Sequence, residues 1–190
     1  MIILASSSPR RRHLLEMLGI EYAVDLPNTP ERAEPGELPE MFAVRLAREK
    51  ALAVARRHPG VPVLGADTVV VVEHRMLGKP ATPAEAVKML TELSGRDHRV
   101  VTAVALARDS VCEERCDVTR VWFRSLPPEI IQAYVATGEP MDKAGAYGVQ
   151  GYGAALVQRI DGDFFSVMGL PLRLVVELLE AAGMPYRFTR

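Results

Sequence analysis

The first twelve residues join an apolar run to side chains that suit a polyanion. Residues 2–5 are apolar, and three serines, Pro9 and the run Arg10-Arg11-Arg12 follow them. Ser8 can cap a helix and Pro9 suits its first position, so a helix is predicted over 9–18. Three cations at the electropositive end of a helix are unfavourable unless an anion binds there. Phosphate is the anion that backbone N–H groups and arginine hold best, and a solvated basic helix start is the alternative.

A single acid interrupts the most apolar stretch of the chain. Between Val63 and Val72, every residue is apolar or glycine except Asp67 and Thr68. Such a run is typical of a strand buried on both faces, where an isolated carboxylate is costly. Asp67 must therefore be paired, bind a metal or be protonated. Two roles are open for Asp67 from its sequence context. It is either a metal ligand or general base, or a structural acid paired with arginine.

Lysine is rare in this chain, and its few positions are informative. Of 23 basic residues only four are lysine: Lys50, Lys79, Lys88 and Lys143. An ammonium is a compact charge that reaches a phosphate oxygen without the width of a guanidinium. Lys50, Lys79 and Lys143 are therefore candidate phosphate ligands, whereas Lys88 has the pattern of an ordinary surface residue. Chance, with aliphatic stems covering apolar surface, is the alternative.

Residues 138–153 hold five glycines together with polar side chains. This glycine density is expected where backbone must approach a ligand closely. The segment also offers Asp142, Lys143, Gln150 and two tyrosines, and Gln150 could read a base edge through paired hydrogen bonds. A tight structural loop is the other interpretation.

Composition narrows the class of protein. The chain has 190 residues, is 48% hydrophobic and 25% charged, and carries a formal net charge of −1. One compact domain over residues 1–190 is the simplest organisation. A near-neutral charge argues against a nucleic-acid partner. The chain has no apolar run near the roughly 20 residues of a membrane span and no secretory leader, so we expect no membrane partner and a cytoplasmic protein.

The two cysteines are expected to be free thiols. Cys112 and Cys116 lie in a stretch that is interpreted as a hairpin or a strand. If both were in one extended strand, about 3.3 Å per residue would separate their Cα atoms beyond disulfide reach. The four histidines show no zinc-like spacing.

Hydrophobic periodicity predicts strands that alternate with helices. Strands are expected at 2–5, 22–26, 61–72, 99–107 and 118–123, and helices at 9–18, 39–57, 82–93, 127–137 and 172–182. A hairpin is expected around Asp161-Gly162-Asp163, with strands at 154–160 and 164–168. The pattern indicates an α/β fold with a mixed, bent central sheet flanked by helices and arranged as two lobes.

Seven motifs follow one another along the chain. They are Ala5–Arg11, Arg45–Ala51, Gly65–Thr68, Gly78–Pro80, Leu93–Gly95, Gly138–Gly151 and Val167–Pro171. Together they resemble the Maf family, closest to its dTTP/UTP pyrophosphatase branch. The resemblance covers nearly the whole chain. It implies a single nucleotide pyrophosphatase domain in which two lobes of a bent, ITPase-like α/β fold surround a cleft.

The implied reaction is hydrolysis of a nucleoside triphosphate between the α and β phosphates. A divalent cation, Mg²⁺ or Mn²⁺, and a homodimer are implied as well. Asp67 matches the family's catalytic acid and, with Glu31, would hold the metal. The positions implied around phosphate and metal are Ser6, Arg11, Glu31, Lys50 and Lys79. Those associated with substrate selectivity are Arg10, Thr68 and Gln150, and this set favours a pyrimidine base.

Two other functions remain open from sequence. The second branch of the family acts on 7-methyl-GTP, although it looks different at the selectivity positions. The family's older naming as septum formation inhibitor suggests a non-catalytic regulator that binds nucleotide or a partner protein.

Overall fold

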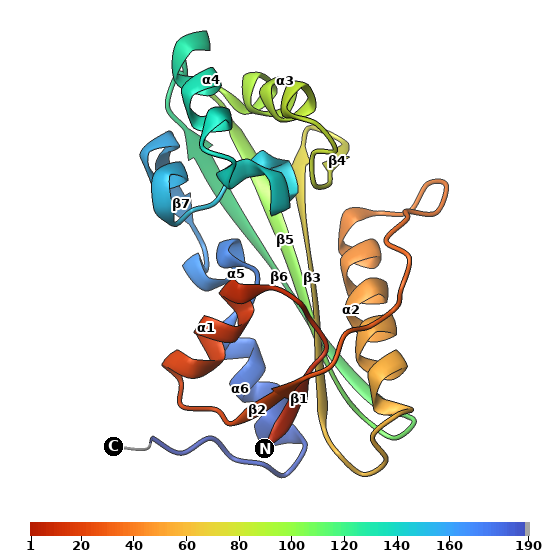
Figure 1. The fold of residues 1–190 in the computed structure, drawn as a ribbon. Helices are drawn as coiled ribbons and strands as arrows, with labels where there is room; N and C mark the ends of the chain where they lie inside the picture. The colour runs from red at the N-terminus through yellow and green to blue at the C-terminus, as the bar shows by residue number, and fades with distance from the viewer. Residues whose placement is uncertain (189–190) are drawn as a thin grey trace. The chain divides into compact units, whose positions relative to one another are not determined.

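A computed structural model describes residues 1–188, which form two compact units (Figure 1). Unit 1 comprises Met1–Asp67, Thr102–Asp117 and the chain from Gly169 onward, and unit 2 comprises Thr68–Val101 and Val118–Met168. The long strands β3 (Val63–Val72), β5 (Asp97–Arg108) and β6 (Val111–Phe123) contribute residues to both units.

Unit 1 contains both ends of the described chain. Its elements are β1 (Ile2–Leu4), α1 (Pro9–Met17), β2 (Tyr22–Val24), α2 (Pro39–Ala55) and α6 (Leu172–Ala181). Strand β1 pairs in parallel with β2 and with β3. Ser8 caps α1 as predicted, its Oγ accepting the Arg11 backbone N–H at 3.4 Å. Figure 1 shows α2 on the opposite side of these strands from α1 and α6.

Helix α2 lies unusually close to β3 because position 65 is glycine. A Cβ atom there would lie 2.3 Å from the Ala47 carbonyl oxygen and 2.8 Å from the Ala51 backbone nitrogen. Real Cβ atoms do not tolerate such distances, so a larger residue would push the helix away. The close approach brings Lys50 on α2 next to Asp67 on β3.

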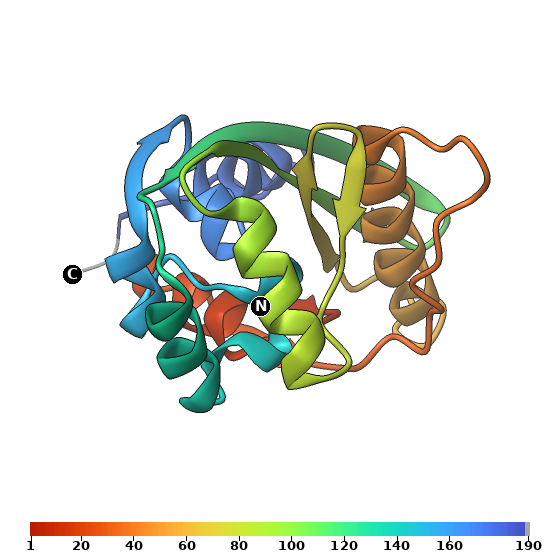
Figure 2. The same cartoon turned by 90° about the horizontal axis from the view of Figure 1, so that it is seen from above.

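Unit 2 is built around a separate hydrophobic core. Its own elements are β4 (Arg75–Leu77), α3 (Pro83–Leu93), α4 (Pro128–Ala136), η1 (Glu139–Asp142), η2 (Ala144–Ala146), η3 (Gly151–Leu156), β7 (Val157–Asp161) and α5 (Phe164–Met168). Strand β4 pairs antiparallel with β3, and β7 pairs antiparallel with β6. Helices α3 and α4 pack side by side (Figures 1 and 2). Leu90, Phe123 and Ile131 are among the core residues.

The predicted fold class is confirmed. The sheet has the strand order β2-β1-β3-β5-β6-β7, with β4 paired to β3, and it mixes parallel and antiparallel pairs. Helices flank it, and the five helices and five strands predicted apart from the hairpin are present, although β5 and β6 are longer than predicted.

The predicted hairpin after β7 is wrong, because residues 164–168 form the short helix α5. Asp163 stabilises the start of this helix, because its Oδ1 accepts the backbone N–H groups of Phe165 at 2.8 Å and Ser166 at 3.3 Å. An aspartate that caps two N–H groups in this way starts a helix rather than a return strand.

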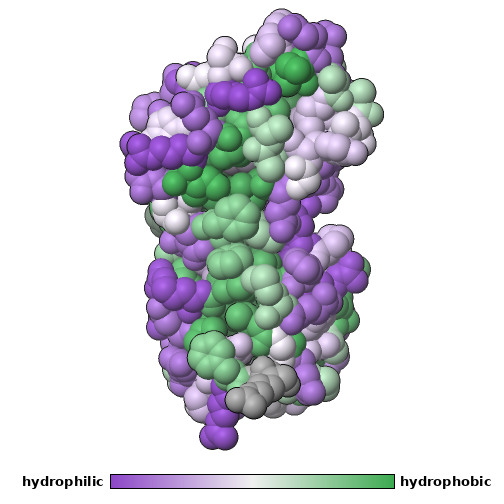
Figure 3. Space-filling view, turned by 90° about the vertical axis from the view of Figure 1, so that its left-hand side faces the viewer, coloured by the Kyte–Doolittle hydropathy of each residue, from purple (hydrophilic) through white to green (hydrophobic). Residues whose placement is uncertain are grey.

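Apolar side chains are exposed in both units. Val24 and Leu26 are examples in unit 1, and Ile130 and Phe164 in unit 2. Figure 3 shows hydrophobic residues among hydrophilic ones on one face. Among residues 1–188, no helix has the length and apolar character needed to cross a membrane.

Candidate active site

The turn between β1 and α1 places Arg11 beside the residue that precedes Asp67. The guanidinium Nη1 donates to the Ala66 carbonyl oxygen at 2.9 Å and to Ser6 Oγ at 3.3 Å. Its Nε donates to the Gly169 carbonyl oxygen at 2.8 Å. Ser6 is buried, and its Oγ also accepts the Ser8 backbone N–H at 3.1 Å. Arg11 is therefore held in a fixed orientation by backbone carbonyls from two distant segments.

Lys50 lies between two carboxylates. Its Nζ is 2.6 Å from Asp67 Oδ1 and 2.5 Å from Glu31 Oε1. The Lys50 and Asp67 side chains are buried, whereas that of Glu31 is 46% exposed. Burial raises the pKa of Asp67 above its usual value, and the positive charges of Lys50 and Arg11 oppose this shift. The arginine pairing considered from sequence is thus replaced by a lysine pairing, with Arg11 close enough to act electrostatically.

The loop that carries Glu31 is tied to α2 by an ion pair that the sequence did not reveal. Arg45 Nε and Nη2 each lie 2.7 Å from an oxygen of Glu37, and Nη2 also donates to the Arg32 carbonyl oxygen at 3.0 Å. Arg45 lowers the pKa of Glu37 to about 2. The sequence did not predict this pair, because Glu37 lies in a loop and Arg45 in a helix. No helical or strand periodicity therefore relates the two residues.

The donor set of unit 1 fits a hard divalent cation. Among residues 1–188, no group of three or more His, Cys, Asp or Glu side chains is arranged to hold a metal by itself. Glu31 and Asp67 nevertheless place two carboxylates against the same atom, Lys50 Nζ. Mg²⁺ is commonly bound by one or two carboxylates with substrate phosphates and water completing its coordination. Such an ion would compete with Lys50 for these oxygens.

Two of the predicted cations lie in neighbouring segments of unit 2. Lys79 is exposed in the turn after β4, and the Gly78 carbonyl oxygen of that turn accepts the Gly145 backbone N–H at 3.0 Å. Lys143 Nζ donates to Asp142 Oδ1 at 2.6 Å and to the Glu139 carbonyl oxygen at 2.5 Å. The turn with Lys79 is therefore pinned to the glycine-rich segment that contains Lys143.

The remaining predicted residues lie at or near the surface. Arg10 in α1 and Thr68 in β3 are partly buried, and Gln150 is exposed. The cysteines are free as predicted, and burial raises the pKa of both Cys112 and Cys116 to about 11. Neither thiol is suited to nucleophilic chemistry at neutral pH.

Protein atoms crowd four of the five glycines of residues 138–153. A Cβ would lie 2.9 Å from Val70 at Gly145, 2.9 Å from Lys143 at Gly148, 2.5 Å from Glu139 at Gly151 and 2.2 Å from a backbone oxygen at Gly153. Of these five glycines, Gly138 alone has no atom within 4 Å of an added Cβ. The tight structural loop is therefore the interpretation that fits these four glycines.

A buried aromatic cluster supports the same segment. His98 Nε2 lies 2.7 Å from the Tyr147 hydroxyl, and both rings meet Phe123 edge to face. Burial lowers the pKa of His98 to about 4. His98 is therefore neutral at physiological pH, and its role in this cluster is structural.

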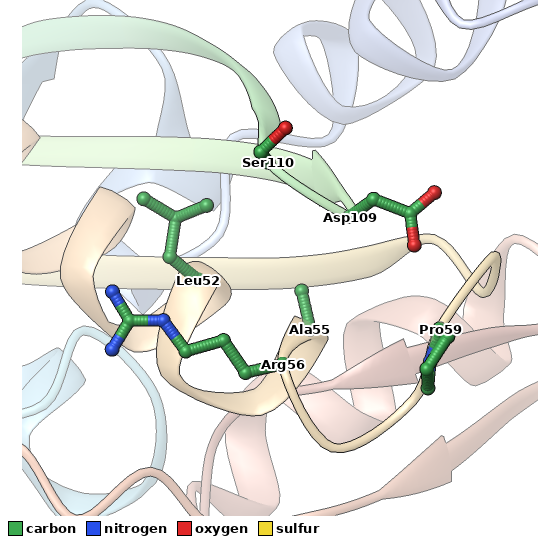
Figure 4. A pocket seen from close by; sticks show the side chains of 6 residues that line it. All are labelled: Leu52, Ala55, Arg56, Pro59, Asp109 and Ser110. Carbon is green, nitrogen blue, oxygen red and sulfur yellow. The ribbon is translucent and has the colours of Figure 1, made fainter.

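A small pocket of about 320 Å³ opens at the end of α2 (Figure 4). Leu52 of α2 and Arg56, the residue after α2, line it together with Asp109 and Ser110 of the β5–β6 turn. Asp109 already accepts the Gly60 backbone N–H at 2.8 Å. None of the candidate residues from sequence lines this pocket, so it is not the candidate active site.

Comparison with known proteins gives consistent matches. The family model described as Maf-like protein matches residues 1–182. A Symbiobacterium thermophilum protein is 52% identical, with 97% of this chain and 95% of that protein covered. A Geobacter metallireducens protein is also 52% identical, with 96% of each covered, and a Bacillus velezensis protein is 48% identical, with 94% and 95% covered. All three are named dTTP/UTP pyrophosphatase.

Among solved structures, the Staphylococcus aureus Ham1 protein matches over 95% of this chain and 96% of that chain. Its TM-score of 0.49 and identity of 17% make this a distant likeness. The family model and the relatives, by contrast, span almost the whole sequence. The chain belongs to the Maf-like protein family.

Proposed function

We propose that this protein hydrolyses dTTP and UTP to the nucleoside monophosphate and pyrophosphate. The observation that carries the proposal is the cluster of Lys50, Asp67, Glu31 and Arg11 in a chain about half identical to dTTP/UTP pyrophosphatases over nearly its full length. Two carboxylates beside fixed cations suit a reaction in which a polyphosphate is bound and water is activated.

The cations supply charge neutralisation. Attack on the α-phosphorus builds negative charge on phosphate oxygens and on the departing pyrophosphate, and preorganised positive groups stabilise both. We assign this role to Arg10, Arg11, Lys50 and Lys79, with Ser6 and the N-terminus of α1 as hydrogen-bonding groups. Arg11 is suited to it because its orientation is fixed before substrate binds.

Asp67 is the group we assign to accept the proton of the attacking water. The new bond joins the water oxygen to the α-phosphorus, and the bond from that phosphorus to the bridging oxygen breaks as pyrophosphate leaves. A carboxyl group whose pKa is raised by burial is a stronger base than an exposed one. Glu31 and Asp67 would hold Mg²⁺ or Mn²⁺, which neutralises phosphate charge when bound. The two roles of Asp67 are alternatives, because a carboxylate that binds a metal is a weaker base.

Selectivity is assigned to polar residues of unit 2. We assign contacts with the substrate to Thr68, Asp142 and Lys143, and reading of the pyrimidine edge to Gln150. An amide side chain donates and accepts at once, so it can match a base edge with paired hydrogen bonds.

We also propose that residues 1–190 act as one enzyme domain, because one family model spans residues 1–182. A homodimer and a cytoplasmic location, where nucleoside triphosphates are made and used, complete the proposal. Light scattering on the purified chain tests the dimer.

Pyrophosphate release tests the proposed reaction. The full chain is incubated with dTTP, UTP, dCTP and 7-methyl-GTP, with Mg²⁺, with Mn²⁺ or with EDTA, and both pyrophosphate and orthophosphate are measured. We expect pyrophosphate from dTTP and UTP, and none with EDTA. Preference for 7-methyl-GTP would assign the chain to the other branch, orthophosphate as first product would indicate γ-phosphate cleavage, and nucleotide binding without turnover would indicate a regulator.

A further inference from the structure

The Glu139 carboxylate is the centre of a hydrogen-bond network in unit 2. Its Oε1 accepts the Tyr134 hydroxyl and the Gly153 backbone N–H, both at 2.9 Å, and its Oε2 accepts the Tyr152 backbone N–H at 2.9 Å. The Tyr134 hydroxyl in turn accepts the Gly148 backbone N–H at 3.2 Å. Two side chains thus hold the backbone on both sides of residues 149–151.

The backbone is wrapped closely around these two side chains. A Cβ at Gly151 would lie 2.5 Å from Glu139 Oε2, and one at Gly153 would lie 2.7 Å from the Tyr134 hydroxyl. Glycine at both positions lets the N–H groups reach the carboxylate. The loop conformation and the Glu139 side chain therefore depend on each other.

The network is charged at neutral pH. Burial raises the pKa of Glu139, but hydrogen bonds from the Gly153 and Tyr152 N–H groups and the Tyr134 hydroxyl, together with the charge of Lys143, leave it below its usual value. An ionised carboxylate that accepts backbone N–H groups forms stronger hydrogen bonds than a neutral group does. These contacts are therefore well suited to fixing the path of the backbone.

Gln150 is exposed in the middle of the segment that this network holds. Tyr134 binds the backbone two residues before it, and Glu139 binds the backbone two and three residues after it. Paired hydrogen bonds to a base edge require the amide to be placed within about 0.5 Å of the productive position. A loop rich in glycine would not keep that position by its own conformational preference.

We propose that Glu139 is a positioning residue that fixes Gln150 and thereby determines which nucleobase the enzyme accepts. This inference rests on the proposed function, in which Gln150 reads the base. Glu139 itself acts only through the loop, because its oxygens are engaged by Tyr134 and by backbone N–H groups.

The test is the substrate preference of Glu139→Gln in the full chain. The amide keeps the shape of the carboxylate but replaces one acceptor oxygen with a donor, so at least one of the loop contacts is lost. We expect kcat/KM for dTTP relative to dCTP to fall about tenfold, chiefly through a higher KM for dTTP. Glu129→Gln, the same change at an exposed position of α4, should leave the ratio unchanged.

A double variant separates positioning from general destabilisation. Gln150→Ala should lower the same ratio, and adding Glu139→Gln to it should lower the ratio no further, because Glu139 acts through Gln150. Tyr134→Phe removes one donor to Glu139 and should give a smaller fall in the same direction. If Glu139→Gln does not fold, the substrate preference of Tyr134→Phe tests the role of Glu139 instead.

The outcomes distinguish the two proposals. Absence of pyrophosphate release from dTTP by both the wild type and Glu129→Gln would refute the proposed function itself. An active wild type whose folded Glu139→Gln or Tyr134→Phe variant keeps the original ratio would overturn the role of Glu139 alone. A further fall in the double variant would show that Glu139 does not act through Gln150.

Discussion

The Lys50 ammonium nitrogen lies 2.6 Å from an Asp67 carboxylate oxygen, and only 7% and 8% of these two side chains are exposed. The contact joins the middle of α2 to β3, two elements held close by Gly65. A buried ion pair is costly to desolvate, so its presence next to Glu31 and Arg11 favours a role in chemistry over one in stability.

Asp67→Asn should abolish turnover while leaving the fold intact. The amide keeps the size of the side chain but cannot accept the proton of water, and removal of a general base typically costs about 100-fold or more in rate. Pyrophosphate release under saturating dTTP measures the loss, and circular dichroism checks the fold. An undiminished rate would remove Asp67 from the reaction.

Lys50→Met should destabilise the protein by about 3 kcal/mol, because it leaves the buried Asp67 carboxylate without its cation. Urea unfolding gives the free energy of unfolding. Adding Asp67→Asn to Lys50→Met should recover part of the loss, since the double variant has no buried unpaired charge at either position. Lys88→Met, at an exposed position of α3, is the matched control and should change stability by less than about 0.5 kcal/mol. Additive losses in the double variant would show that the two groups are not coupled.

Gly65→Ala should destabilise the protein by about 1–3 kcal/mol, because the added Cβ meets the backbone of α2 at Ala47. The shift of α2 should also lower turnover, since Lys50 lies on that helix. Gly78→Ala is the control for stability, because a Cβ there has no atom within 4 Å. Equal unfolding midpoints for the two variants would contradict the close packing of α2 on β3.

Stability should fall as the pH decreases from about 6.5 to 4, partly because of His98. Its pKa is about 4 in the folded protein and 6.5 when unperturbed, so the unfolded chain binds a proton over this range and the folded chain does not. The contribution of neutral His98 to the free energy of unfolding is complete above pH 6.5. Between pH 6.5 and 4 this contribution decreases by up to about 1.4 kcal/mol for each unit by which the pH falls.

His98→Gln isolates this contribution, because glutamine does not titrate. Its unfolding free energy should depend less steeply on pH than that of the wild type between pH 6.5 and 4, while the carboxylates affect both proteins alike. Parallel pH profiles would show that His98 is protonated equally in the folded and unfolded chains.

Local sequence signals predicted helices and strands well where a capping residue, a proline or an apolar run determines the backbone conformation. Ser8 and Pro9 began α1, Thr82 capped α3, and the apolar run at 63–72 formed β3. The hairpin after β7 failed because Asp163 serves equally well in a turn and at a helix start, and the chain after it decided between them.

Residue type alone identified Asp67 as an acid that needed a partner and Lys50 as an unusual cation, because burial of charge and rarity of lysine are visible along the chain. That these two residues are each other's partner was decided by the packing of α2 on β3, which no local pattern encodes. The same holds for Glu37 with Arg45 and for Glu139 with backbone N–H groups: the sequence contains the donors and acceptors, and only the folded chain brings them within hydrogen-bonding distance.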